Sequence, residues 1–194
     1  VFFLARILGA LYFINNIDDK DLVARSRRSL IGNSVLFLVF FLSFVIRTLL
    51  ADGYAVNPET GEVFMEPYKY LTNFIEMPLV LVLFLIGVVL VLFGIGKSLL
   101  KTKFDKGIWF TGIGTVLAVL ALLLVAGYNN TAYYPSTNDL QSSLTLANSC
   151  SSEFTLRTMA YVSILVPFVL AYIIYAWRAI DRKPITAKEL EQDG

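Results

Sequence analysis

The sequence predicts an all-α, polytopic membrane protein of about five transmembrane helices, forming a four-helix bundle plus one peripheral helix. Of its 194 residues, 57% are hydrophobic and only 16% are charged, whereas soluble domains carry about 25% charged residues. Mean hydropathy is +0.68, and the apolar residues gather in long segments. This balance excludes a disordered chain and disfavours a soluble globular enzyme.

Five apolar segments are candidate membrane spans: residues 1–17, 29–51, 74–96, 108–128 and 158–178. A bilayer core about 30 Å thick requires roughly 20 helical residues, and the last four segments reach that length. The first is short and lacks the charged start and cleavage site of a secretory signal. We therefore expect the chain to begin inside a helix, as the second part of a longer polypeptide. Residues 1–194 are expected to form one transmembrane domain, with 179–194 as a cytoplasmic tail.

The basic residues predict an orientation for these spans. The connections 18–28 and 97–106 and the C-terminal end from Arg178 hold 12 of the 16 Lys and Arg residues. The positive-inside rule places these regions, and the C-terminus, in the cytoplasm. Trp109 and Trp177 then lie at the inner ends, as in an aromatic belt. The outer connections, 52–73 and 129–157, are longer, and a strong turn signal occupies 57–61.

Ionisable residues within spans are candidate functional residues. Arg6 lies about 16 Å before Ile17 at helical rise, near mid-membrane if the helix continues upstream. There it either has a buried partner, in this chain or another subunit, or extends to the interface. Arg47 and Glu76 lie at the outer ends of adjacent spans. They either pair across the helices or, as we favour, act separately near helix ends.

Residue types that are absent or rare in the sequence limit the kinds of reaction and ligand that the chain can support. The sequence has no histidine, the commonest ligand of heme and transition metals and the commonest catalytic base. Cys150 is the single cysteine, so no intrachain disulfide and no Cys-based zinc site can form. A net charge of +1 offers no basic face to nucleic acid. The sequence therefore predicts no catalytic, cofactor-binding or metal-binding residue.

Glycine and proline within the spans suggest how the helices pack. Gly87 and Gly94 are on one face of a helix, and Gly112 and Gly114 thin the next. They either allow close approach of the helices or reflect the general frequency of glycine in membrane helices. Pro167 is expected to kink the last span.

Several stretches together resemble a known family. Near the start these are residues 9–12 (Gly-Ala-Leu-Tyr) and the Leu-x-x-Arg-Ser-Arg of 22–27. Later come 134–136 (Tyr-Pro-Ser), 142–149 (Ser-Ser-Leu-Thr-Leu-Ala-Asn-Ser) and 151–159. With Pro167 and the basic tail, they resemble the C-terminal half of subunit II of cytochrome bd-type quinol oxidases. The Ser-Leu-Thr-Leu pattern is the most specific part.

The resemblance implies a non-heme subunit of a respiratory quinol:oxygen oxidoreductase in the bacterial cytoplasmic (inner) membrane. Hemes b and d and the quinol site are implied to belong to subunit I, where quinol oxidation is coupled to reduction of dioxygen to water. This chain would scaffold subunit I, shape proton or oxygen access and bind a structural quinone, with no activity alone. Its implied partners are subunit I, quinone and the lipid bilayer. Leu8 stands where many relatives have His, so no role is carried over to it.

The residues themselves leave two alternatives open. One is a fragment of a small-molecule transporter, which would need broken helices near the membrane midplane. Only Pro167 and the glycines hint at that arrangement. The other is a membrane scaffold with no redox partner. Copurification with a heme protein distinguishes the oxidase subunit from both, and stabilisation of the chain alone by a ligand would favour the transporter.

Overall fold

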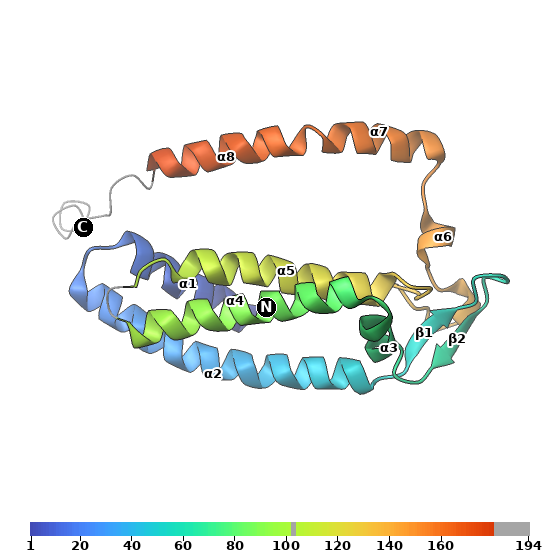
Figure 1. Ribbon diagram of the computed structural model, residues 1–194, viewed down its shortest axis with the longest axis horizontal. Coiled ribbons are helices and arrows are strands. Elements are labelled where there is room, and N and C mark those ends of the chain that lie inside the picture. Colours follow the sequence, from blue (N-terminus) through green and yellow to red (C-terminus); the bar gives the residue numbers. More distant parts are fainter. Residues whose placement is uncertain (102–103, 181–194) are drawn as a thin grey trace.

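The computed structural model describes residues 1–101 and 104–180, so nearly all of the expected tail, 179–194, lies outside the described residues. Helices α1 (Phe2–Asn16), α2 (Lys20–Leu50), α4 (Pro78–Leu100) and α5 (Gly107–Gly127) lie side by side (Figure 1). A broken helix, made of α7 (Glu153–Ser163) and α8 (Val166–Ile180), runs alongside them. The remaining elements gather at one end: β1 (Gly53–Val56), β2 (Val63–Glu66), α3 (Lys69–Glu76), η1 (Leu140–Ser142) and α6 (Leu146–Ser149). We call this the hairpin end and the other the turn end.

The spans agree with the prediction in class and place. Within the described part of the chain, four helical stretches are long and apolar enough to cross a membrane: Lys20–Leu50, Pro78–Leu100, Gly107–Gly127 and Glu153–Ile180. Helix α1, with 15 residues, is apolar but shorter. The all-α polytopic class is therefore confirmed, with four full-length candidate spans and one short helix.

Helix α2 corrects the expected connection at 18–28. The Asp19 carboxylate accepts the backbone N–H of Leu22 at 2.7 Å, which caps the helix and lets it begin at Lys20. Leucine, arginine and lysine are good helix formers, so the basic residues here lie on the first turns of a 31-residue helix. Only 17–19 connect α1 to α2.

Glycines bring α4 and α5 into backbone contact. A Cβ at Gly87 would lie 2.6 Å from the backbone nitrogen of Ala118, and one at Gly114 would lie 2.6 Å from the carbonyl oxygen of Gly87. A Cβ at Gly94 would meet the carbonyl oxygen of Gly107 at 2.7 Å. Close approach is thus confirmed for these residues and is the geometry that small residues allow in membrane helices. The prediction of close approach is wrong for Gly112, because no atom would lie within 4 Å of a Cβ added there.

At the turn end, Arg27 of α2 caps the C-terminus of α4. Its half-buried side chain donates from Nη1 to the carbonyl oxygens of Ser98, at 2.7 Å, and Lys101, at 3.2 Å. These carbonyls end α4, where a helix has unpaired acceptors and a partial negative charge. Arg27 therefore ties α2 to the end of α4 across 71 residues of sequence.

Replacing Arg27 with glutamine should remove this cap and destabilise the protein by about 1 kcal/mol. Arg25→Gln is the matched control, since Arg25 is exposed on the same helix. The measurement is the thermal midpoint of each purified variant. If the thermal midpoint falls equally in the two variants, the loss of a positive charge, and not the loss of the cap on α4, would explain the destabilisation.

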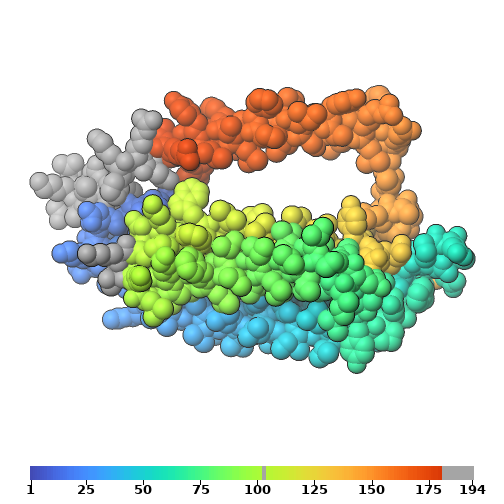
Figure 2. Space-filling model, viewed as in Figure 1, coloured from blue at the N-terminus to red at the C-terminus, as the bar shows by residue number. Residues whose placement is uncertain are grey.

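Helices α7 and α8 are interrupted where Pro167 predicts a kink. Because the proline ring excludes the carbonyl of Ser163, the chain between the helices uses tighter bonds, such as Leu165 N–H to the Val162 oxygen at 2.9 Å. Every residue of the two helices except half-buried Ala176 is exposed. Figure 2 shows an open gap between them and the bundle.

The turn at 57–61 joins the strands of a β-hairpin, which the all-helical reading did not include. The register runs from Gly53 opposite Glu66 to Val56 opposite Val63. The Asn57 carboxamide oxygen accepts the backbone N–H of Glu59 at 2.9 Å, the local bond typical of asparagine in turns.

Other segments cover both edges of this hairpin. Beside β1, the N–H of Val56 donates to the Asn130 oxygen at 2.7 Å, and the N–H of Ala132 donates to the Tyr54 oxygen at 2.8 Å. Beside β2, the side-chain amide of Gln141 pairs with the backbone of Val63, accepting at 2.9 Å and donating at 2.8 Å. The hairpin is thereby fixed to the segments that follow α5.

Candidate functional site

Asn73, on α3, is the centre of a buried polar network at the hairpin end. Its side chain is 0% exposed. Its Nδ2 donates to the Val125 carbonyl and to the Thr131 hydroxyl, both at 2.8 Å. Its Oδ1 accepts from Nδ2 of Asn129 at 3.0 Å. Both donors and the acceptor of the amide are used, so Asn73 joins α3 to α5 and to the segment after it.

Asn129 extends this network to Glu76. Its Nδ2 also donates to the Glu76 carboxylate, and the chain reverses at Asn129 and Asn130, whose φ angles are 56° and 51°. Asparagine tolerates this left-handed conformation better than most residues. Residues 129–131, at the start of the predicted connection 129–157, therefore link α3 to the segment after α5.

Glu76 ends α3 and does not lie in the first turn of a span. Pro78 has no backbone N–H, so α3 ends and α4 begins with proline in its first turn. This places the start of the third span at Pro78, later than the predicted residue 74. Arg47 is exposed on the last turn of α2, and it is not within ion-pair distance of Glu76. The two residues do not pair with each other.

Lys69 and Tyr70 form the base of the hairpin. Lys69 is 7% exposed, and its Nζ lies 3.1 Å from the Glu66 carboxylate. Burial, and then the neighbouring Tyr54, raises the pKa of the Tyr70 phenol above its usual value. Both groups act structurally here, because the lysine is paired and the phenol is held neutral.

The Ser-Leu-Thr-Leu stretch folds on itself beside the hairpin. Ser143 is fully buried, and its hydroxyl accepts the backbone N–H of Ser136 at 3.0 Å. Thr145 and Asn148 form a reciprocal capping box at the start of α6, and Asn148 also donates to the Ser143 carbonyl at 2.9 Å. Its polar residues are thus satisfied by local bonds.

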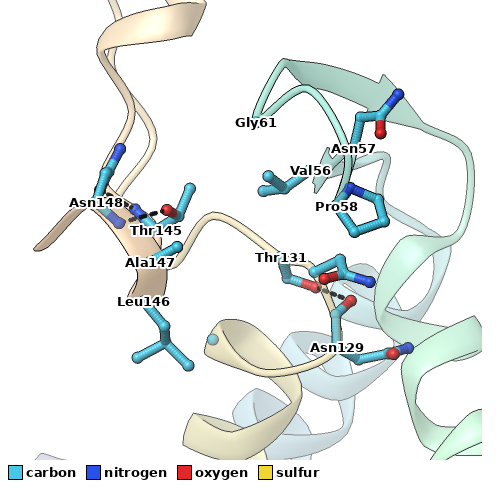
Figure 3. A pocket seen from close by; sticks show the side chains of 12 residues that line it. Val56, Asn57, Pro58, Gly61, Asn129, Thr131, Thr145, Leu146, Ala147 and Asn148 are labelled. Carbon is cyan, nitrogen blue, oxygen red and sulfur yellow. Dashed lines mark hydrogen bonds between the residues drawn. The ribbon is translucent and has the colours of Figure 1, made fainter. Parts of the chain in front are cut away.

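A pocket of about 630 Å³ lies between the hairpin turn, the segment after α5 and α6 (Figure 3). Its lining is Val56, Asn57, Pro58, Gly61, Gly127, Asn129, Asn130, Thr131, Thr145, Leu146, Ala147 and Asn148. These residues offer amides and hydroxyls but no charge, thiol or imidazole. The pocket can hydrogen-bond a neutral partner, but it has no strong acid or base for catalysis.

The comparison with protein families decides what this architecture belongs to. The family model described as cytochrome bd terminal oxidase subunit II matches residues 1–180. The chain belongs to this family. The cytochrome bd-I ubiquinol oxidase subunit 2 of Escherichia coli strain K12 is 29% identical over 153 residues, which are 77% of this chain and 38% of that relative. The proteins of the same description from strains O6:H1 and O157:H7 match to the same extent. The chain thus spans less than half the length of these curated relatives.

The structure places the predicted residues Arg6, Arg47 and Glu76 on the surface of the described chain. Arg6 is exposed on α1, with its guanidinium carbon 5.6 Å from the centre of the Phe2 ring. It is therefore not buried within the described chain. Contact of Arg6, Arg47 or Glu76 with another subunit stays a prediction.

Proposed function

We propose that this chain is part of the non-heme subunit of a cytochrome bd-type quinol:oxygen oxidoreductase and that it scaffolds the heme-bearing subunit I. The observation that carries this is the stretch Glu153–Ile180, whose most apolar 18-residue window is 0% buried in the chain. An apolar helix without a partner in its own chain is covered by lipid or by another subunit. Helices α7 and α8 and the face of α5 opposite them provide two walls for such a subunit.

The commonest axial ligand of heme, histidine, is missing from this chain. Besides histidine, a chain can offer Met, Cys or Tyr as axial ligands. Its methionines are spread over β2, the junction of α3 with α4, and α7, while Cys150 is exposed beyond α6. We therefore assign hemes b and d, and the oxidation of quinol with reduction of dioxygen to water, to subunit I. The chain alone is then without activity.

The proposal includes a role in access to the reaction site and a structural quinone. No Asp, Glu, Lys or Arg occurs between residues 78 and 96 or between 107 and 127. Such apolar spans suit dioxygen better than protons, because a proton path needs polar or ionisable groups. An uncharged quinone would rest against the same apolar faces. We also propose that the enzyme lies in the bacterial cytoplasmic membrane, with the turn end and the C-terminus in the cytoplasm.

A reduced-minus-oxidised optical spectrum tests this function directly. The complex is purified through a tag on this chain. Bands of b- and d-type hemes are expected, and they would belong to a copurifying subunit. A clean preparation without heme, from cells known to express the oxidase, would contradict the proposal and favour a transporter fragment or a scaffold without redox partner.

Arg6→Leu should reduce assembly with the heme-bearing subunit. If Arg6 meets a buried acceptor on that subunit, its loss costs about 2–5 kcal/mol of association. The measurement is the ratio of heme to this chain after purification. Arg28→Leu is the control, because Arg28 is exposed on α2 at the turn end. Equal ratios in the two variants would assign Arg6 to the membrane interface instead.

A further inference from the structure

Helix α8 returns to the bundle at the turn end and forms a cleft there. The cleft has a volume of about 740 Å³ and lies between the end of α1, the start of α5 and the last turns of α8. Ile108, Ile173, Trp109 and Trp177 supply apolar walls. Tryptophan favours the boundary between hydrocarbon and headgroups, so this cleft opens where a lipid headgroup would lie.

Two opposite charges line the cleft without pairing. Arg178 reaches it from α8 and Asp105 from the segment before α5. Both are exposed, and within residues 1–101 and 104–180 neither has a hydrogen bond or ion pair. Exposed charged side chains that do not pair with each other remain available to a ligand that carries one positive and one negative charge.

A third polar group in the cleft has an unused donor. Asn16, at the end of α1, lines the cleft. Its Oδ1 accepts from Asn15 at 2.8 Å, whereas its Nδ2 is buried and has no hydrogen-bond partner in the described structure. A buried amide donor without an acceptor is uncommon in proteins, so this end of the cleft has hydrogen-bonding capacity that the described chain does not use.

We propose that this cleft binds a zwitterionic aminophospholipid of the bilayer. Arg178 binds the phosphate, Asp105 binds the ammonium group, and the acyl chains lie along Ile108 and Ile173 inside the cleft. An anionic lipid would meet the repulsion of Asp105. A neutral quinone would use neither charge, and a soluble headgroup would leave the apolar walls uncovered.

The test compares lipids on the purified, delipidated complex. Phosphatidylethanolamine is expected to raise the thermal midpoint more than phosphatidylglycerol at equal concentration, because a ligand stabilises the state that binds it. Free phosphoethanolamine at the same concentration is expected to have no effect. Equal stabilisation by the two lipids would overturn the proposal, and an equal effect of the free headgroup would identify a soluble ligand in place of a lipid.

Two substitutions test the charges separately. Arg178→Gln should weaken binding of phosphatidylethanolamine roughly tenfold or more, the effect of one charge-assisted hydrogen bond. Asp105→Asn should remove the preference for phosphatidylethanolamine over phosphatidylglycerol. Lys106→Gln, an exposed neighbour that does not line the cleft, should change neither. Unchanged binding in Arg178→Gln would overturn the proposal, and the comparison of lipids on the unmodified complex stands even if a variant fails to assemble.

Discussion

Replacing Gly114 with alanine is expected to destabilise the protein by about 1–3 kcal/mol, the usual cost of overpacking a core. The added Cβ would lie 2.6 Å from the carbonyl oxygen of Gly87 and 2.8 Å from the backbone nitrogen of Val91. Both atoms belong to the backbone of α4 and cannot swing aside as a flexible side chain would. The two helices must therefore separate along the whole seam.

Gly112→Ala provides the matched control for this prediction. It adds the same methyl group two residues earlier on the same helix, where nothing lies within 4 Å. Alanine also favours helix by about 1 kcal/mol over glycine, so this variant should be as stable as the unmodified protein or slightly more so. The measurement is the fraction that stays monodisperse in size-exclusion chromatography after heating. Identical melting of the two variants would show that α4 and α5 are not packed backbone to backbone.

Asn73→Ala should loosen the hairpin end. The substitution leaves the Val125 carbonyl and the Thr131 hydroxyl without their buried donor, and each unsatisfied group costs about 1–3 kcal/mol. Because Asn73 joins α3 to the segment after α5, this segment should become accessible. The expected result is a lower thermal midpoint together with faster cleavage within residues 128–145 by an added protease.

Asn138→Ala is the control for Asn73. Asn138 is exposed at the same hairpin end, and within the described residues its carboxamide makes no hydrogen bond. Its replacement should leave both the midpoint and the cleavage rate unchanged. If Asn73→Ala is cleaved no faster than Asn138→Ala, the network does not hold this end together.

The membrane spans were predictable because hydropathy and length alone define them. Runs such as Gly107–Gly127 contain no charge over 21 residues, and only a buried or membrane helix accommodates that. The kink at Pro167 was predictable because proline's missing N–H acts locally. The early start of α2 was not, since lysine and arginine are common both in cytoplasmic loops and on exposed helix turns. Asp19 decides between them, and its capping bond is visible only in three dimensions.

The hairpin end was less predictable because its hydrogen bonds join residues that are distant in the sequence. Asn73 binds Val125 and Thr131 across 52 and 58 residues, and Gln141 reaches Val63 across 78. A lone asparagine beside an apolar run gives no sign of such partners. Arg6 is exposed on α1 and has no buried partner among the described residues, so its contact with a second chain stays a prediction.

The covered edges of the hairpin decide how this region can meet other proteins. An open sheet edge displays unpaired N–H and C=O groups that attract further strands, and a two-stranded sheet has two such edges. Here the backbone of 130–132 occupies one, and the Gln141 amide blocks the other at Val63. Strand addition and edge-to-edge self-association are thereby disfavoured. A protein that binds the hairpin end must therefore recognise the side chains and the surface shape of this region. It cannot bind by adding a strand to the sheet.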